Sequence, residues 1–344
     1  MKILSLIVPA YNSEQFLDKG IPSFLHPDVI DQLDIIIVND GSRDNTAEKA
    51  ETYCRMYPDS IRLISQENKG HGGALNTGCA AAVGKYLKVI DADDWVVTEN
   101  LPVFFEQLKN CTSDVVLTHH HTIDISTGEV KSWRSYPENF GRAYTFAEIM
   151  PQWKNFDRSL TFHGITYNTE FYHRRGMKLS EHVFYEDHEF ATYPCCMAES
   201  ITVFDLFIYE YRIGDVTQSV SNENQLKRLS HTETVLRRLV SEYRTLPEDI
   251  SQGGRDYVCM KVQGLLMSYL TTTMLVCPDK KQGRELAGQM MAYMRLNLPG
   301  AWEKAAKQYT VFDILNRLHI SKETFEKVLH SRIYNKLRNN HDFN

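Results

Sequence analysis

The stretch that decides the fold is residues 86–95, Tyr-Leu-Lys-Val-Ile-Asp-Ala-Asp-Asp-Trp. A mostly apolar strand, residues 86–90, runs directly into a cluster of carboxylates at Asp91, Asp93 and Asp94. A near-continuous apolar run of this kind is typical of a strand that is buried on both faces. Carboxylates so close together repel one another, and a divalent cation relieves this repulsion. Hard oxygen ligands suit Mg²⁺ or Mn²⁺, which typically also bind substrate phosphates.

Similar units lie on both sides of this stretch. Apolar runs predict further strands at residues 3–8, 34–38, 61–65 and 115–118, with helical patterns between them. We also expect a glycine-rich turn at 70–73 before a helix, a hairpin about 126–128, and strand, helix and strand at 161–172, 187–198 and 201–213. Strands that alternate with helices predict right-handed βαβ units, and therefore an α/β fold with a mostly parallel sheet. From about residue 222 onward the pattern is nearly all helical.

Polar clusters follow four of the predicted strands. They are residues 9–12 (PAYN), 39–44 (NDGSRD), 68–73 (NKGHGG) and 91–94 (DADD). In an open parallel sheet, ligands bind beyond the carboxyl ends of the strands. Turn formation alone explains any one of these clusters, but four at one edge indicate a binding site.

Composition bounds the class of protein. The chain has 344 residues, of which 42% are hydrophobic and 24% charged, which suits one large or two globular domains. The net charge of −6 argues against a nucleic-acid-binding protein, and no apolar run approaches the ~20 residues of a membrane span. The short apolar N-terminus lacks the cleavage site of a signal peptide. Seven cysteines without regular spacing indicate reduced thiols in a cytoplasmic protein.

The glycine-rich segment does not match the common nucleotide-binding fingerprints. Gly70 and Gly72 have the spacing of the first two glycines of a dinucleotide fingerprint, but Leu75 stands where the third belongs. That fingerprint also follows a first strand, where this chain has Pro9, and no Walker A motif is present. A Rossmann dehydrogenase and a P-loop nucleotidase are therefore excluded.

The motifs PAYN, NDGSRDNT, NKGHGGALNTG and DADDW, in this order and spacing, resemble family 2 glycosyltransferases with the GT-A fold. The resemblance covers about residues 3–100 and one later motif, Glu186-Asp187. It implies a nucleoside-diphosphate sugar as donor, most often a UDP-sugar, and a Mn²⁺ or Mg²⁺ ion. The implied residues fall into two groups. Those that line the nucleotide sugar are Pro9, Tyr11, Asn12, Glu14, Asp40, Asn68, Lys69, Gly70, Asn76, Asp91, Ala92, Asp93 and Arg212. Those that hold the metal are Asp93 first, with Asp91 and Asp94.

The resemblance also implies the catalytic base. Sugar transfer with inversion is an in-line displacement in which the acceptor hydroxyl loses its proton, and a positioned carboxylate can accept that proton. Asp187 matches the family's base, with Glu186 supporting it. Acidic residues are also favoured in the first turn of a helix, and both explanations can hold together.

One position departs from the family. An arginine commonly precedes the residue that matches Asn76, whereas this chain has Leu75. We expect Lys69, His71 or Arg212 to supply the missing positive charge. Arg212 precedes a loop, residues 216–221, that also resembles the family; a solvated surface role for this arginine is an equal alternative.

Histidines add little to the prediction. His119, His120 and His121 are consecutive, and consecutive residues of a strand point to opposite faces, so they do not converge on one metal. A role in the acceptor site remains open for them. His163 is expected in a pocket or in the core.

The sequence therefore predicts a metal-dependent, inverting glycosyltransferase. Residues 1–220 form the GT-A domain, with a nucleotide-sugar half at about 1–118 and an acceptor half at 119–220, and residues 221–344 form a helical region. The expected role is cell-surface polysaccharide or glycolipid synthesis on a saccharide or lipid-linked acceptor. The alternatives are a non-catalytic nucleotide-sugar-binding or scaffold protein and a sugar nucleotidyltransferase.

Charge differs between these two regions. Residues 1–220 carry a net charge of −12 and residues 221–344 a net charge of +6. Near the C-terminus, Leu329, Ile333 and Leu337 form an apolar helical stripe beside Lys327, Arg332, Lys336 and Arg338. This helix either packs on its own protein or another subunit, or it lies on the inner face of an anionic membrane.

Overall fold

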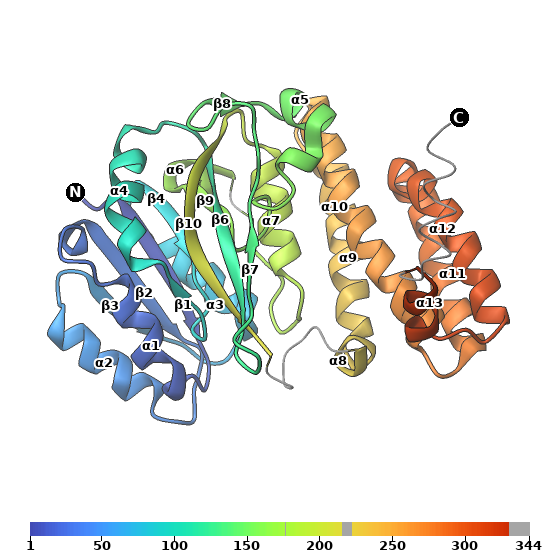
Figure 1. The fold of residues 1–344 in the computed structure, drawn as a ribbon, viewed down its shortest axis with the longest axis horizontal. Helices are drawn as coiled ribbons and strands as arrows, with labels where there is room; N and C mark the ends of the chain where they lie inside the picture. The colour runs from blue at the N-terminus through green and yellow to red at the C-terminus, as the bar shows by residue number, and fades with distance from the viewer. Residues whose placement is uncertain (176, 215–221, 330–344) are drawn as a thin grey trace. The chain divides into compact units, whose positions relative to one another are not determined.

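The computed structural model describes residues 1–175, 177–214 and 222–329. Within them, all strands join into one sheet. They are β1 (Leu4–Ala10), β2 (Leu33–Asn39), β3 (Ile61–Ser65), β4 (Tyr86–Val89), β5 (Trp95–Val96), β6 (Val115–Asp124), β7 (Val130–Trp133), β8 (Ala143–Tyr144), β9 (Ile165–Asn168) and β10 (Ile201–Ile213). The order is β3-β2-β1-β4-β9-β6-β10-β5, with β7 paired to β6 and β8 to β10 (Figure 1).

The α/β fold predicted from the apolar runs is confirmed. β1, β2, β3 and β4 pair in parallel, and β6 pairs in parallel with β10. Every residue of β1 and β2 is buried, as expected for strands covered on both faces. β9 runs antiparallel between β4 and β6, and so joins β1, β2, β3 and β4 to the part of the sheet that continues into β10.

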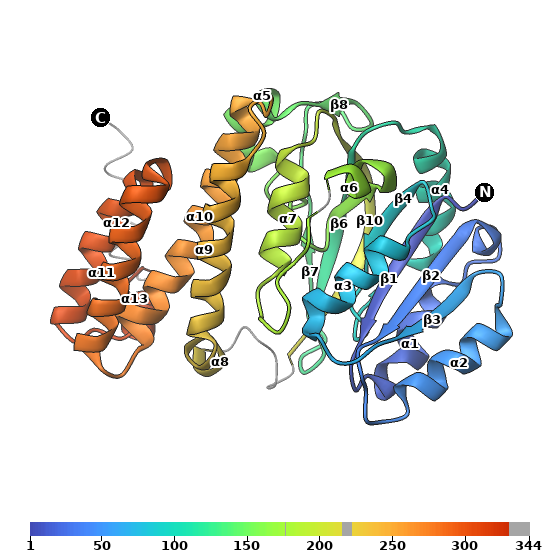
Figure 2. The same cartoon turned by 180° about the vertical axis from the view of Figure 1, so that it is seen from behind.

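Helices cover both faces of the sheet. They are α1 (Glu14–Phe24), α2 (Thr46–Met56), α3 (Gly70–Ala81), α4 (Leu101–Asn110), α5 (Phe146–Ile149), α6 (Thr169–Arg175) and α7 (Asp187–Cys196). α1 and α4 lie on the face seen in Figure 1, and α3 and α7 on the face seen in Figure 2. α3 lies very close to β1, because a Cβ on Gly78 would come within 2.3 Å of Ile7 Cγ2. A glycine is therefore required there.

Two local predictions differ from the structure. The glycines at 70–73 form the first turn of α3 itself instead of a separate turn, because only Gly70 has a positive φ, of 76°. The predicted strand at 161–172 is shorter, since β9 covers only residues 165–168 and α6 follows at once. Both differences come from local conformation that hydrophobic periodicity does not report.

The chain divides into two compact units. The first contains residues 1–218 and 246–258, and the second contains residues 219–245 and 259–344. The helices from α8 onward are α8 (Asn222–Lys227), α9 (Leu229–Thr245), α10 (Gln252–Thr271), α11 (Lys280–Asn297), α12 (Pro299–Arg317) and α13 (Lys322–Leu329). Among the residues described, none of the helices has the length and apolar character needed to cross a membrane.

Two sequence predictions fall outside the described residues. The family-like loop at 216–221 is one of them. The other is the apolar stripe near the C-terminus: Ile333 and Leu337 lie beyond residue 329, and the side chain of Leu329 is not described.

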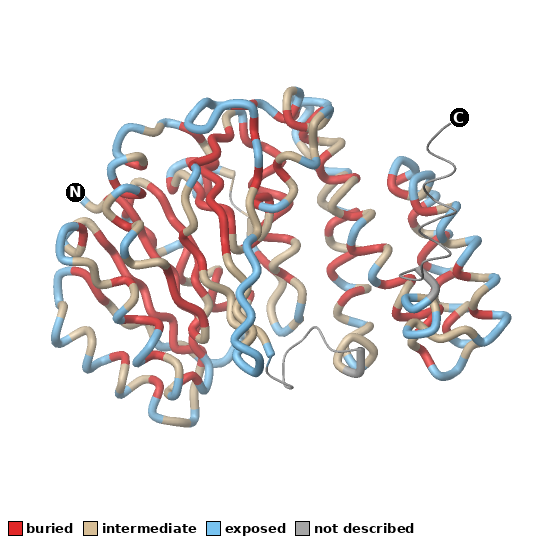
Figure 3. Tube along the Cα trace, in the orientation of Figure 1, coloured by how far each residue is buried: buried red, intermediate tan, exposed pale blue. Residues whose placement is uncertain are grey.

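The core of the first unit lies between the sheet and its helices. Figure 3 shows the buried segments concentrated in the central strands. α1 contributes Leu17, Ile21 and Phe24 to this core, and α4 contributes Phe104 and Phe105. These residues fall on one side of each helix, so burial of that side fixes the helix against the sheet.

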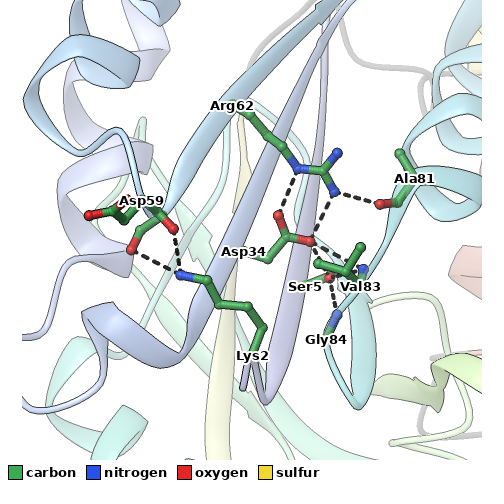
Figure 4. A network of polar contacts seen from close by, with 9 residues as sticks. Lys2, Ser5, Asp34, Asp59, Arg62, Ala81, Val83 and Gly84 are labelled. Atoms are coloured by element: carbon green, nitrogen blue, oxygen red, sulfur yellow. Dashed lines mark hydrogen bonds and ion pairs between the residues drawn. The ribbon is translucent and has the colours of Figure 1, made fainter.

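A buried carboxylate holds the amino ends of the strands together (Figure 4). Asp34 on β2 is 5% exposed and accepts hydrogen bonds from Arg62 Nε at 2.8 Å and Arg62 Nη2 at 3.1 Å. It also accepts from the Ser5 hydroxyl at 2.6 Å and from the Val83 amide at 3.3 Å. One side chain thus links β1, β2, β3 and the segment after α3, at the end of the sheet opposite the polar clusters.

We expect Asp34→Ala to destabilise the protein by about 2–3 kcal/mol, because buried donors then lose a charged acceptor. For a domain of this size the melting temperature should fall by roughly 4–10 °C. Thermal unfolding followed by circular dichroism measures this. Asp31→Ala, at an exposed site nearby, is the matched control and should change stability by no more than ~0.5 kcal/mol. Equal losses in the two variants would show that the network contributes nothing.

Candidate functional site

The loops after β1 and β2 are hydrogen-bonded to each other. Asn12 has a positive φ of 50°. Its backbone amide donates to Ser42 Oγ at 3.0 Å, and its side-chain Oδ1 accepts from the backbone amide of Arg43 at 2.8 Å. Pro9 is buried at the end of β1, whereas Tyr11 is 47% exposed. Tyr11 is therefore open to stack on a planar group, while Asn12 shapes the loop.

Glu14 and Asp40 are also tied to backbone amides. Glu14 Oε2 accepts from the Asn45 amide at 2.8 Å. Asp40 is buried, and its Oδ1 accepts from the Lys69 amide at 2.9 Å. The Asn68 side chain in turn donates to the Asp40 carbonyl at 2.9 Å. The structure thus brings Asp40, Asn68 and Lys69 together, as the resemblance implies.

The start of α3 lies directly under the segment that leads to Glu186. Residue 70 must be a glycine, because a Cβ at this position would lie only 2.9 Å from the backbone nitrogen of His182. Asn76 exchanges two hydrogen bonds with the backbone of Leu179, at 3.0 and 2.8 Å. The side-chain amide of Asn76 therefore anchors the segment that begins at Leu179.

His71 joins the carboxylates of the two acidic motifs. Its Nε2 lies 2.9 Å from Asp91 Oδ1 and its Nδ1 lies 2.5 Å from Glu186 Oε1. Burial alone would lower the pKa of His71, but the two carboxylates raise that pKa well above its usual value. Burial likewise opposes ionisation of Asp91, yet His71 holds the pKa of Asp91 below its usual value. Glu186 Oε2 is buried with no hydrogen-bond partner among the described residues.

Asp94 is part of the core. It is 1% exposed, and its two oxygens accept from the Tyr209 hydroxyl at 2.5 Å and the Arg212 amide at 2.7 Å. Burial, with the charge of Asp91 close by, raises its pKa well above the usual value. Ala92, two residues earlier in the same turn, is also buried, and its carbonyl oxygen lies close to Gly20 of α1. Asp94 therefore fixes the turn after β4 to β10.

Asp93 is the open member of the cluster. Its side chain is 37% exposed, and Oδ2 lies 3.6 Å from Arg212 Nη1. Burial and the charge of Asp91 raise the pKa of Asp93 to about 6. The two neighbouring aspartates thus face different surroundings: Asp93 is accessible and Asp94 is enclosed.

Asp187 begins α7 beside this cluster. The residue before Glu186, Tyr185, has a φ of 74°, a conformation that a bulky residue rarely adopts. Asp91 and Asp187 both act electrostatically on the partly buried His163, whose pKa is lowered to about 4 by desolvation. Asp187 and the cluster also act together on the phenol of Tyr211, whose pKa is raised by burial first. The two acidic motifs therefore converge, although about 90 residues separate them.

Two of the three aspartates, Asp91 and Asp93, have carboxylate oxygens without a hydrogen-bond donor among the described residues and suit a divalent cation. Asp93 is exposed, and only one oxygen of Asp91 is taken up by His71. Both oxygens of Asp94 are already engaged, and the described residues contain no group of three metal-ligating side chains. Mg²⁺ and Mn²⁺ sites commonly use one or two carboxylates together with substrate phosphates, so the remaining pair is chemically suitable.

The three consecutive histidines have separate neighbours. His119 contacts Ser159 at 3.2 Å and Asp205 at 3.3 Å, and the His121 ring stacks on Phe207 with centroids 4.3 Å apart. His120 is buried and stacks on Trp133. The structure does not bring the three rings together at one point.

Residues 5–175 match the family model described as "Glycosyl transferase family 2". The chain belongs to glycosyltransferase family 2. The matched range includes the polar clusters after β1, β2 and β4, together with His71, and it ends before Glu186 and Asp187. The family match therefore covers the polar clusters at the carboxyl ends of the strands, but not the start of α7.

Two relatives are themselves described as glycosyltransferases. The glycosyltransferase is 31% identical to the glycosyltransferase GlyG of Streptococcus pneumoniae over 128 residues, 37% of this chain and 42% of GlyG. It is 28% identical to the uncharacterized glycosyltransferase EpsJ of Bacillus subtilis over 246 residues, 70% of this chain and 68% of EpsJ. The match thus spans less than half of GlyG and about two thirds of EpsJ.

A solved structure has the same fold. Residues 1–349 of S. aureus TarS in complex with UDP-GlcNAc superpose with a TM-score of 0.61, at 18% identity, over 93% of each chain. At this identity the similarity establishes the fold. It extends past the family match, so the GT-A fold with an added helical C-terminal region is confirmed.

From the sequence alone, His71 had only one possible role, as an alternative to Lys69 or Arg212 for the positive charge that is missing at Leu75. In the glycosyltransferase His71 lies one helical turn before Leu75, which is completely buried. Positions four apart share a helix face, so the spacing of His71 from Leu75 was the available signal. His71 and Arg212 place positive charge at Asp91 and Asp93 respectively.

We expect His71→Gln to lower the stability of the glycosyltransferase most at low pH. A group whose pKa is raised on folding stabilises fully below its unfolded value, near 6.5, and this stabilisation is lost as pH rises through the folded pKa. At about pH 6 we expect a loss of about 1–3 kcal/mol. This is below the value for a fully buried pair, because the side chain is 36% exposed. Urea unfolding of both proteins at about pH 6 and at about pH 10 measures the difference. An equal loss at both values would show that His71 acts by packing and not by charge.

Proposed function

We propose that this glycosyltransferase transfers a sugar from a UDP-sugar to an acceptor hydroxyl with inversion, assisted by a divalent cation. The observation that carries the proposal is the junction of Asp91 and Glu186 through His71. It supports a single site that contains both the accessible carboxylate after β4, Asp93, and the carboxylate that begins α7, Asp187. UDP is the first nucleotide to test, because TarS, which shares the fold, is known in complexes with UDP and UDP-GlcNAc.

The residues have separate roles in this proposal. Tyr11 stacks on the base, and the Asp40–Asn68–Lys69 group lines it. Asp93 and Asp91 hold the cation, which, when bound, neutralises charge on the departing diphosphate. Arg212 lies beside Asp93 and can contact the diphosphate as a charged donor.

Asp187 is proposed as the base. It takes the proton from the acceptor hydroxyl as that oxygen attacks the anomeric carbon, and UDP leaves from the opposite side. Glu186 does not face the acceptor in this scheme, since His71 holds it and it is 3% exposed. Glu186 instead positions the start of α7, and Asn76 supports the preceding segment through its hydrogen bond to the Leu179 carbonyl.

Release of UDP tests the function. Purified protein is incubated with UDP-GlcNAc and other UDP-sugars, with and without Mn²⁺ and a panel of saccharide and lipid-linked acceptors. The proposal expects acceptor-dependent release of UDP. A non-catalytic scaffold would bind UDP-sugar, as seen by a raised melting temperature, yet release no UDP with any acceptor.

A further inference from the structure

A row of side chains crosses the three neighbouring strands β10, β6 and β7, beginning near the proposed base. Tyr211 of β10 lies opposite Thr122 of β6, and Thr122 lies opposite Lys131 of β7. Residues directly opposite in neighbouring strands project from the same face of a sheet. Two strand spacings separate the ends of the row, so the backbone of Lys131 lies about 10 Å from that of Tyr211.

The near end of this row belongs to the proposed site. The Tyr211 ring lies against the ring of His163, with centroids 4.3 Å apart. Asp91 and Asp187 act electrostatically on both rings. Tyr211 and His163 are each partly exposed, so their rings offer a surface to a sugar beside Asp187.

The far end of the row carries two cations on one indole ring. Lys131 Nζ lies 4.2 Å, and the guanidinium carbon of Arg158 4.8 Å, from the centroid of Trp133. Trp133 is held in place because its Nε1 donates to Thr122 Oγ1 at 2.8 Å and its ring stacks on His120. The two cations therefore have a fixed support at the edge of the sheet.

These cations are incompletely neutralised. Lys131 is exposed and forms no ion pair within the part of the chain that the structure describes. Arg158 meets Asp157 through Nε at 3.5 Å, and its side chain is 51% exposed. Two like charges on one ring repel each other, and a bound anion relieves this. Residues 1–220 carry a net charge of −12, so this pair of cations is a local positive site in an acidic region.

We propose that Lys131 and Arg158 bind an anionic group, a phosphate or a carboxylate, on the acceptor saccharide, while Tyr211 and Thr122 lie beneath the sugars between that group and Asp187. The inference rests on the proposed glycosyl transfer and names the chemical class of its acceptor. An arginine fork and a lysine ammonium both suit an anionic oxygen group. A neutral acceptor would leave these charges unused.

Binding of matched oligosaccharides tests the inference without turnover. Trigalacturonate, its neutral methyl ester and a glycerol-phosphate trimer are titrated by calorimetry into UDP-saturated protein. We expect one charged oligomer to bind at least tenfold more tightly than the ester, and the tighter of the two identifies carboxylate or phosphate. This preference should weaken as salt is raised.

In the double variant Lys131→Gln/Arg158→Gln, the charged oligomer and the neutral ester should bind about equally tightly. UDP binding should be unchanged, and this shows that the variant is folded. Lys109→Gln/Arg55→Gln removes the same two charges from α4 and α2 and should keep the preference. Equal binding of charged and neutral oligomers by the parent, or a preference that survives in the first variant, overturns the inference alone. A parent protein that does not bind UDP overturns the proposed function, and the inference with it.

Discussion

Asp187→Asn should lower the turnover of UDP-sugar by roughly 10²–10⁴ while donor affinity stays nearly unchanged. The asparagine side chain keeps the shape of aspartate but does not accept the proton of the acceptor hydroxyl. Asp187 is only partly buried at the start of α7, so the substitution leaves no buried group unpaired. Initial rates of UDP release give turnover, and calorimetry with UDP gives donor affinity.

Two further variants make this test specific. Asp28→Asn changes the same charge at a side chain that is 74% exposed and should leave both quantities unchanged. Glu186→Gln breaks a charged contact with His71 and should lower stability as well as turnover. A loss of donor affinity with normal turnover in Asp187→Asn would assign Asp187 to binding, and the base would have to be sought elsewhere.

The strands and their polar ends were predictable because they depend on short-range pattern. Apolar runs such as residues 33–39 are buried throughout, and parallel strands bring their carboxyl ends to one edge wherever the helices lie. This reasoning placed Asp40 and Asp93 at the same edge of the sheet without any knowledge of contacts. It also set the α/β class, which the order of the sheet confirms.

The roles of adjacent residues were not predictable in the same way. Composition and spacing do not separate Asp93 from Asp94, and only the family resemblance put Asp93 first. In the folded protein the difference comes from Tyr209, which lies 115 residues from Asp94 and donates a hydrogen bond to it. His71 reaches Glu186 over the same separation, 115 residues. Contacts between distant parts of the chain depend on how the elements pack, which periodicity and motif spacing do not encode.

Residues 119–220, which the sequence predicted to form the acceptor half, show the same limit. The pattern at residues 118–135 predicted strands and a hairpin, but the pairing of Thr122 with both Tyr211 and Lys131 is a matter of register. A shift of one residue would place each side chain on the other face. The row that leads from Asp187 to Lys131 therefore exists only in the folded protein.

Asp93→Ala should abolish the Mn²⁺-dependent part of UDP binding while the protein stays folded. Asp93 is accessible, with a side chain 37% exposed, and its loss leaves Arg212 without one acidic neighbour. UDP affinity is measured by calorimetry with and without Mn²⁺, and the melting temperature is measured in parallel. Because burial and Asp91 raise the pKa of Asp93 to about 6 in the metal-free protein, the Mn²⁺-dependent binding of the parent should weaken as pH falls below about 6.

Asp94→Ala is the matched comparison, one residue along the same turn. It removes the acceptor of the Tyr209 hydroxyl and the Arg212 amide, and should therefore cost about 2–3 kcal/mol of stability through buried donors left unpaired. When Asp94→Ala is kept folded, for example at lower temperature, its UDP binding should still depend on Mn²⁺. UDP binding by Asp93→Ala should not depend on Mn²⁺ even where that variant is fully folded. If Asp93→Ala binds UDP with the parent's Mn²⁺ dependence, Asp93 is not a metal ligand, and the exposed carboxylate of this turn serves Arg212 instead.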